Sequence, residues 1–363
     1  MPNPVNGSNN KKSAERDALS GFFSLPLFKQ RFILYDYHIV CAIYSYLERK
    51  IGMGKEKIGV YGTGRIGACE ATLTTGNGFP TVVVGHSKAG MERCRQTIEE
   101  NWEVLIGQGL ATSQNKQAAL KLLTITDDCR LLDGCSFIFE AVLEKLEVKA
   151  DVFAKIEANC AENTVIASCT SSFPVRVLEQ VVKHKDRILI AHPFQPAHML
   201  PLVEVVRGEH TSDEAVAHTR SLLESLRRKV VVMKKDLPGF LVNRFAQALF
   251  RESIYLIEQG VVTAEEIDMA IKYAMGMRYA SIGLLEYFDD VGFQLEQEIA
   301  TNVYPDLCAA TQPQQLVKDG IAAGKTGLAA GQGLYDWSKK DLEDYKMRKQ
   351  APYFKELDWD MPV

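Results

Sequence analysis

The sequence predicts a doubly wound α/β domain followed by an all-α domain, and two observations support this prediction. Between residues 57 and 233, apolar runs of strand length alternate with stretches of helical spacing. This alternation is typical of a parallel sheet with helices on both faces. Beyond residue 236 no strand-like run follows, and helical spacing continues. The 363 residues of the chain have room for two domains of ordinary size.

The composition argues against nucleic-acid binding, disulfides and a metal site. A hydrophobic fraction of 46% and a charged fraction of 24% are ordinary for a globular chain. The net charge of -4 gives no support for nucleic-acid binding. The eight cysteines show no C-x-x-C spacing, so we expect neither disulfides nor a metal site, and we expect a cytoplasmic location.

Residues 1–53 differ from the rest of the chain. They begin polar, and their apolar run at 32–44 is interrupted by Asp36 and His38. That run is too short to span a bilayer, and no signal-peptide pattern accompanies it. We interpret 1–53 as a non-essential N-terminal extension and expect no membrane partner.

A glycine-rich loop follows the first clear strand, at residues 57–61, and opens a helix. Its sequence matches the G-x-G-x-x-G pattern of dinucleotide-binding folds, in the structural context that the pattern requires. Gly62 allows the tight turn, Gly64 lets the backbone approach a pyrophosphate, and Gly67 permits close helix–strand packing. Arg65 and Ile66 complete the loop. We therefore predict a Rossmann-type cofactor site.

The end of the second strand, at residues 81–84, lacks the acid that usually binds the adenosine ribose. Gly85, His86, Ser87 and Lys88 stand there instead. An acid at this place would repel a 2′-phosphate, and here that repulsion is missing. NADP therefore remains possible beside NAD.

Polar residues recur where the later strands end. We expect helices at 89–106, 114–122, 127–132 and 143–158, and strands at 123–126, 136–139 and 164–167. Glu140, Ser171 and His192 then all follow strands. In doubly wound sheets ligands bind at the carboxyl ends of the strands, so we expect these three residues to line one site.

The segment from residue 191 to residue 206 joins two apolar runs through a loop with three prolines. His192 stands where the first run ends, and Glu204 lies inside the second. A histidine beside a carboxylate in an apolar setting is suited to act as a general base. Taken alone, the pattern slightly favours a loop histidine and a strand glutamate on an exposed face. The convergence with Glu140 and Ser171 favours the catalytic interpretation.

We place the domain boundary near residues 236–238. The predicted parts are the extension 1–53, a dinucleotide-binding domain 54–237, a helical domain 238–338 and a tail 339–363. Helices are expected at 240–258, 263–275 and 291–304, the second of which begins with the capping box Thr263 to Glu266.

Taken together, these motifs resemble those of the L-3-hydroxyacyl-CoA dehydrogenase family over residues 56–338. The resemblance rests on the glycine loop, on Thr170-Ser171-Ser172, on the segment from His192 to Glu204, on 238–244 and on 325–337. It implies fatty-acid metabolism, an NAD cofactor and a homodimer formed by the C-terminal helices.

The resemblance also implies roles for individual residues. His192 and Glu204 would form the catalytic pair, Ser171 and Asn243 would hold the substrate oxygen, and Glu140 would lie near the nicotinamide ribose. The implied reaction is oxidation of a short-chain, 3-hydroxybutyryl-CoA-like L-3-hydroxyacyl-CoA to the 3-ketoacyl-CoA, or its reverse.

Three departures from the family pattern bear on the substrate. Gln195 replaces the usual asparagine near the base, Cys169 replaces the asparagine before Thr170, and the segment 276–283 carries Arg278. This segment is similar to the branch of lambda-crystallin (gulonate dehydrogenase) and carnitine dehydrogenase, which oxidise free 3-hydroxy acids. Arg278 could pair with a free carboxylate, whereas Lys116 and Lys121 could contact the phosphates of a CoA carrier. We expect the acyl-CoA, with the free acid as the alternative.

Two other classes share this two-domain plan. One is a catalytically silent, crystallin-like structural protein, which the intact His192, Glu204, Ser171 and Asn243 argue against. The other is the 3-hydroxyisobutyrate or 6-phosphogluconate dehydrogenase type, which relies on a lysine base in the helical domain instead of a His–Glu pair.

Overall fold

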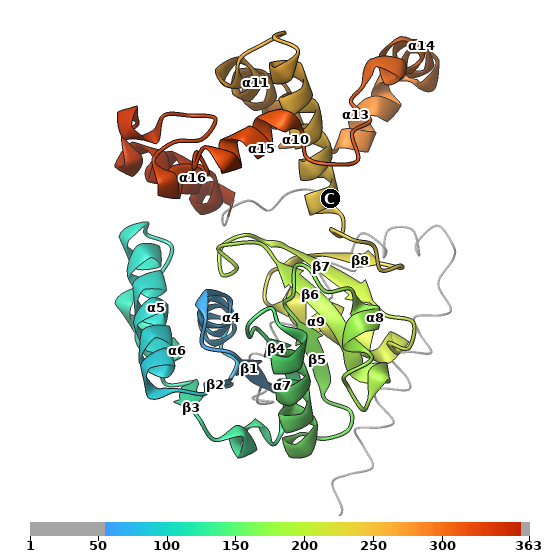
Figure 1. Ribbon diagram of the computed structural model, residues 1–363. Helices are drawn as coiled ribbons and strands as arrows, with labels where there is room; N and C mark the ends of the chain where they lie inside the picture. Colours follow the sequence, from blue (N-terminus) through green and yellow to red (C-terminus); the bar gives the residue numbers. More distant parts are fainter. Residues whose placement is uncertain (1–54, 357–363) are drawn as a thin grey trace, which may run out of the picture. The chain divides into compact units, whose positions relative to one another are not determined.

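The computed structural model describes residues 55–356 (Figure 1). It confirms the predicted fold class, because an eight-stranded α/β sheet is followed by a region built only of helices. The interpreted extension 1–53 and residues 357–363 lie outside the described part of the chain.

The sheet has the strand order β3-β2-β1-β4-β5-β6-β7-β8. Its strands are β1 (Lys57–Tyr61), β2 (Thr81–Val84), β3 (Leu123–Thr126), β4 (Cys135–Glu140), β5 (Val165–Ser168), β6 (Ile188–Pro193), β7 (Leu202–Arg207) and β8 (Lys229–Met233). The pairs from β3 to β6 are parallel, as expected, but β7 runs antiparallel to β6. The loop between β6 and β7 is too short for the crossover that a parallel pair needs, so the chain turns back at the same edge.

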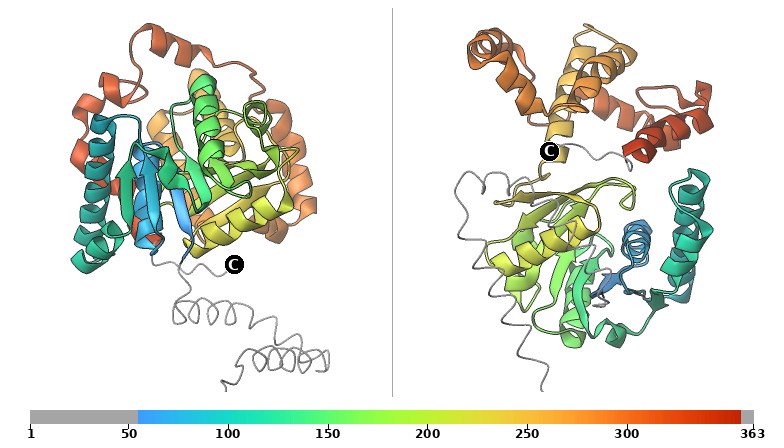
Figure 2. Two further views of the ribbon diagram at one scale, coloured as in Figure 1. Left: turned by 90° about the horizontal axis from the view of Figure 1, so that it is seen from below. Right: turned by 180° about the vertical axis from the view of Figure 1, so that it is seen from behind.

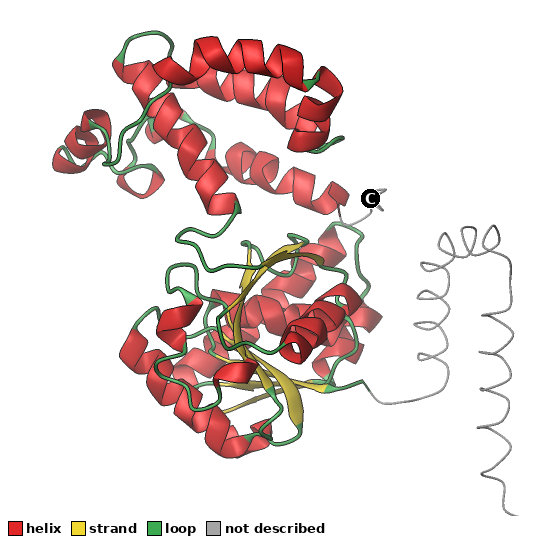
Figure 3. Ribbon diagram, turned by 90° about the vertical axis from the view of Figure 1, so that its right-hand side faces the viewer, coloured by secondary structure: helices red, strands yellow, loops and turns green. Residues whose placement is uncertain are grey.

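Helices cover both faces of the sheet (Figure 3). One buried cluster receives side chains from the sheet and from α4 (Arg65–Gly76), α5 (Lys88–Gly107), α6 (Ser113–Leu120) and α9 (Asp213–Ser225). The other receives them from α7 (Leu146–Asn159), α8 (Val175–Leu178) and the 3-10 turn η1 (Cys129–Leu132). A second 3-10 turn, η2 (Lys185–Arg187), precedes β6.

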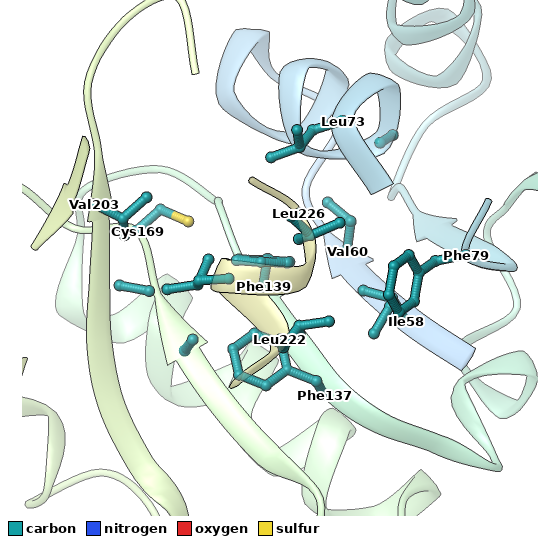
Figure 4. Close-up of a cluster of buried hydrophobic side chains, with 14 of the residues drawn as sticks. Ile58, Val60, Leu73, Phe79, Phe137, Phe139, Cys169, Val203, Leu222 and Leu226 are labelled. Carbon is teal, nitrogen blue, oxygen red and sulfur yellow. The ribbon is translucent and has the colours of Figure 1, made fainter. Parts of the chain in front are cut away.

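The first cluster includes Val60 of β1, the strand that leads into the glycine loop at residues 62–67. Figure 4 shows Val60 of β1, Phe137 and Phe139 of β4, and Leu222 of α9 in this cluster. All four side chains are at most 2% exposed. Burial of this kind contributes about 1.5–3 kcal/mol for each large apolar side chain. The loops at the strand ends are therefore held by a dense core.

The C-terminal region from Val242 onward is helical (Figure 2, orange and red). Its elements are α10 (Val242–Glu258), α11 (Ala264–Ala270), the π-helical η3 (Ile271–Gly276), α12 (Met277–Tyr279), α13 (Leu284–Val291), α14 (Phe293–Val303), η4 (Tyr304–Asp306), α15 (Gln315–Ala322), η5 (Leu328–Ala330), η6 (Trp337–Lys339) and α16 (Leu342–Glu356). The capping box at Thr263 and Glu266 is present. The segment predicted to be a tail, 339–363, contains α16, so that interpretation missed a helix.

Candidate active site

Strands β6 and β7 place His192 and Glu204 opposite each other. The antiparallel register pairs the two residues directly, and His192 Nδ1 lies 2.9 Å from Glu204 Oε2. Glu204 is fully buried and His192 is 7% exposed. A carboxylate that faces Nδ1 favours the tautomer with the proton on Nδ1, in which Nε2 is the acceptor. This is the tautomer that a general base would use.

The second oxygen of Glu204 holds the start of the helical region. Oε1 accepts hydrogen bonds from the backbone N–H groups of Leu241 at 2.9 Å and Val242 at 2.8 Å. Just before them, Gly239 and Phe240 have φ values of 77° and 48°, which turn the chain into α10. Asn243, in the first turn of this helix, follows the amides that Glu204 binds. One carboxylate thus orients the imidazole and fixes the segment that carries Asn243.

The loop between β6 and β7 is anchored from two sides. His198 Nδ1 lies 3.2 Å from the Cys69 Sγ of α4, and the buried Arg228 donates to two loop carbonyls at 2.9 and 3.4 Å. Burial and the charge of Arg228 lower the pKa of His198 to about 4, so this ring is neutral at pH 7. Gln195 lies exposed in the same loop and precedes a cis peptide bond to Pro196.

Glu140, at the end of β4, forms a buried ion pair. Lys149 Nζ lies 2.9 Å from both of its carboxylate oxygens, and the two residues are 0% and 1% exposed. Ser168 Oγ donates to Glu140 at 2.5 Å, and the Val142 N–H donates at 2.9 Å. The carboxylate is therefore well satisfied by the protein itself. Its expected proximity to the nicotinamide ribose stays a prediction.

Ser171 lies exposed in the turn after β5. Its neighbours Thr170 and Ser172 both donate their hydroxyl groups to Glu144. Within the described part of the chain, the Ser171 hydroxyl has no hydrogen-bond partner. It is therefore the hydroxyl of this turn that is left for a ligand.

The three glycines of the loop between β1 and α4 differ in the space around them. A Cβ on Gly62, whose φ is 131°, would lie 2.3 Å from a backbone carbonyl after β4, and a Cβ on Gly67 would lie 2.1 Å from the Gly62 carbonyl. A Cβ on Gly64 would meet nothing within 4 Å. Gly64 is also the N-cap of α4 and provides no side-chain cap, while Arg65 and Ile66 form the first turn. Open space before an uncapped helix N-terminus fits the pyrophosphate of a dinucleotide.

The end of β2 carries donors, as the sequence indicates. His86 is exposed, and Ser87 Oγ accepts from the Gly90 N–H at 3.2 Å, which caps α5. A hydroxyl can accept and donate at once, and the Ser87 hydroxyl has no acceptor among the described residues, so its proton can be donated to a ribose oxygen.

The contacts of Arg278 include none of the site residues described above. It is exposed on α12, and its guanidinium lies 4.1 Å from the centroid of the Tyr287 ring. Among the described residues it has neither a carboxylate partner nor a recorded contact with the loop of His192. Its assignment to the substrate site stays a prediction.

Sequence analysis missed three residues around this site: Lys149, Glu144 and His198. A signal for Lys149 was present, because it precedes Val152, Phe153 and Ile156 by three, four and seven positions and so lies on the buried face of α7. A lysine on such a face needs an anionic partner. No comparable local signal marks His198.

Two further observations concern the described residues. None of their helices is long and apolar enough to cross a membrane. No group of three or more histidine, cysteine, aspartate or glutamate side chains among them could hold a metal ion.

A glycine loop on a Rossmann-type sheet and a buried His–Glu pair are features that a nicotinamide-dependent dehydrogenase would use. Residues 57–237 match the model of the 3-hydroxyacyl-CoA dehydrogenase NAD binding domain, and residues 239–337 match that of the C-terminal domain. The chain belongs to the 3-hydroxyacyl-CoA dehydrogenase family. It is an NAD-dependent oxidoreductase, as predicted.

Individual relatives differ in what their names say they act on. A 5-formyl-3-hydroxy-2-methylpyridine 4-carboxylate 5-dehydrogenase from Mesorhizobium japonicum is 30% identical over 296 residues, which cover 80% of this chain and 95% of the relative. An L-carnitine dehydrogenase from Oceanobacillus iheyensis is 36% identical over 229 residues, which cover 63% and 73%. The structure of (S)-3-hydroxybutyryl-CoA dehydrogenase from Ralstonia eutropha has a TM-score of 0.66 and 29% identity, covering 78% of this chain and 99% of that one.

Proposed function

We propose that His192 is the general base and Glu204 its orienting partner in the oxidation of a substrate hydroxyl. NAD, when bound, supplies the hydride acceptor. His192 Nε2 takes the hydroxyl proton, while Nδ1–H donates to Glu204, whose negative charge stabilises the imidazolium that forms. The observation that carries this proposal is the 2.9 Å contact between two buried residues in direct register.

Ser171, Asn243 and Gln195 are proposed to hold the substrate. The hydroxyl of Ser171 is exposed in its turn, and Asn243 follows amides that are bound to Glu204. Hydrogen bonds from these side chains to the reacting oxygen would keep its proton directed at His192.

For the substrate class, a small free hydroxy acid has the better support. L-Carnitine and the pyridine 4-carboxylate of the two curated relatives both carry a free carboxylate. Arg278 is held by its stacking on Tyr287 but is not neutralised by an acid of the described chain. Its planar guanidinium is suited to bind a carboxylate through two hydrogen bonds. Of the two lysines that could contact the phosphates of CoA, Lys116 pairs with Glu103 at 2.7 Å on the surface.

A short-chain L-3-hydroxyacyl-CoA is the second candidate. The descriptions of both family models and the likeness to the Ralstonia eutropha enzyme favour it. The two candidates differ in whether the acid is free or is a thioester, which a direct comparison of substrates resolves.

The test is kcat/KM with NAD for L-gulonate, L-carnitine and free 3-hydroxybutyrate, against (S)-3-hydroxybutyryl-CoA. We expect turnover of at least one free acid and a large loss with Arg278→Met. Lys272→Met is the matched control, since Lys272 also lies over a tyrosine ring, at 5.0 Å. Turnover of the CoA ester alone, unchanged in Arg278→Met, would replace the free acid by the second candidate.

Three further points complete the proposal. The donors at the end of β2 should let NADP replace NAD more readily than an acid there would. The helical region should form a homodimer. The location should be cytoplasmic, where the thiols of a cysteine-containing chain stay reduced.

A further inference from the structure

A pocket of about 280 Å³ lies beside the ends of β7 and β8. Arg207, the last residue of β7, is paired with Leu189 near the start of β6, and β8 runs parallel to β7 and ends beside it. The pocket therefore lies toward the opposite end of these strands from His192. None of the described residues that line it is among those proposed for the cofactor or the substrate. Since doubly wound sheets bind their main ligands at the carboxyl ends of the parallel strands, this is a separate place on the molecule.

Four cationic and two acidic side chains line this pocket. They come from α8, from the end of β7 and from the segments that follow β7 and β8. The six residues are Arg176, Arg207, Glu209, Lys234, Lys235 and Asp236. The lining therefore has an excess of two positive charges.

The two arginines of the pocket are held by ion pairs, whereas the two lysines are not. Arg176 pairs with Asp236 at 3.1 Å, and Arg207 pairs with Asp213 at 2.8 Å. Both lysines are exposed, and neither has an ion pair with a residue in the described part of the chain. An exposed lysine alone is ordinary, but two unpaired ammonium groups beside two fixed guanidinium groups form a local positive field.

The wall of the pocket formed by the loop after β7 is fixed by its own contacts. Arg207 Nη2 donates to the Thr211 carbonyl at 2.8 Å, and the Gly208 N–H donates to Thr211 Oγ1 at 2.8 Å. A Cβ on Gly208 would lie 2.1 Å from Oε1 of the buried Glu179, so the loop packs closely against the end of α8. A ligand of this pocket would therefore meet a wall that is already formed, which lowers the entropy cost of binding.

We propose that this pocket binds the phosphate group of a small phosphate monoester, with Arg176, Lys234 and Lys235 as the groups that contact it. Arginine and lysine are the side chains with which proteins bind phosphate, and an excess of positive charge favours a dianion. The volume suits a molecule of a few carbon atoms rather than a nucleotide. This site is independent of the proposed function.

The test is calorimetric titration of the full chain, saturated with NAD, with glycerol 3-phosphate at constant ionic strength. Saturation with NAD keeps the phosphate away from the glycine loop, which is suited to bind anions as well. We expect saturable binding with a Kd of about 1 mM or below. Lys234→Gln combined with Lys235→Gln should raise the Kd on the order of tenfold or more, because it removes two charges from the pocket.

Lys183→Gln combined with Lys185→Gln is the matched control, since it removes two charges from exposed lysines that do not line the pocket, and it should keep the Kd of the parent. Citrate, a multivalent anion without phosphate, should bind more weakly than glycerol 3-phosphate. Absence of saturable binding, or an equal rise of the Kd in both double variants, would overturn the site. Citrate binding as tight as that of glycerol 3-phosphate would overturn the assignment to phosphate.

Discussion

Lys149 is a charged side chain among the apolar residues of α7. Its ion pairs with Glu140 and Glu144 offset the free-energy cost of burying its charge. It is 1% exposed, and Glu140, its closer partner, is fully buried. A buried ion pair stabilises a fold little more than apolar residues of similar volume would. The loss of one partner, however, leaves the other charge buried and unpaired.

Lys149→Met is therefore expected to lower the free energy of unfolding by about 3–5 kcal/mol. Lys155→Met is the control on the same helix, since Lys155 is half exposed and pairs with Asp151 only four residues away. That surface pair should contribute about 0.3–0.5 kcal/mol. Chemical denaturation of both variants checks the difference, and equal losses would mean that the buried pair is not strongly coupled.

His192 offers a second comparison at the residue scale, because the chain contains another His–Glu pair. His218 Nε2 lies 2.8 Å from Glu56, with both side chains 31% exposed. His192→Ala should lower kcat by on the order of 10² or more and leave NAD affinity nearly unchanged. His218→Ala should leave kcat unchanged. Near-normal turnover of the His192 variant would contradict its role as the base.

His86 is expected to influence how strongly NAD is preferred over NADP. His86→Asp places a negative charge where the 2′-phosphate of NADP would lie, so the ratio of kcat/KM with NAD to that with NADP should rise. Steady-state kinetics with both cofactors measure this ratio. Strong exclusion of NADP by the parent, with an unchanged ratio in the variant, would show that the loop does not select the cofactor.

At the scale of elements, two glycines of the β1–α4 turn are expected to differ in role: Gly67 is needed for folding and Gly64 for cofactor binding. Gly64→Ala should fold normally, because its Cβ would meet nothing within 4 Å, but the methyl group would occupy space meant for the pyrophosphate. Gly67→Ala would force a Cβ to within 2.1 Å of a carbonyl oxygen and should lower the Tm. Thermal unfolding and NAD titration of both variants test this contrast. Loss of stability in Gly64→Ala, with unaltered NAD binding, would contradict it.

The sequence predicted those elements whose signal is local. Most strands through β6 appear as apolar runs because the inner strands of a parallel sheet are buried on both faces. Ser171 follows β5 as expected from such a run, whereas His192 lies inside β6, which extends to Pro193. The direct pairing of His192 with Glu204 depended on a hairpin that the sequence did not reveal as antiparallel. The helix α16 was missed because Pro352 and a polar composition obscure it.

Contacts between distant residues were beyond the reach of such patterns. Cys69 and His198 are 129 positions apart, and their 3.2 Å contact depends on how α4 packs beside the β6–β7 loop. Glu144 and Ser172 are 28 positions apart and meet only because β4 and β5 are neighbours. These residues support the site without having a motif of their own.

At the scale of the whole molecule, the helical region buries very little of its apolar surface within one chain. From Val242 onward, only Ile254 and Cys308 are buried among the residues whose side chains are described. Large apolar side chains are exposed instead, including Leu285 at 80% and Phe293 at 73%. Exposed apolar surface of this extent is typical of an interface.

A second copy of the chain is the occupant that we expect on this surface, so the protein should have about twice the 40.5 kDa mass of one chain in solution. Since association stabilises the folded state by mass action, the Tm should rise with concentration over about a hundredfold range. Leu285→Arg should shift the mass toward the monomer and lower the Tm, because it places a charge in the interface. Leu131→Arg, at a 43% exposed position before β4, should change neither. Sedimentation velocity measures the mass, and a monomer whose Tm is independent of concentration would show that these helices are not covered by a second copy.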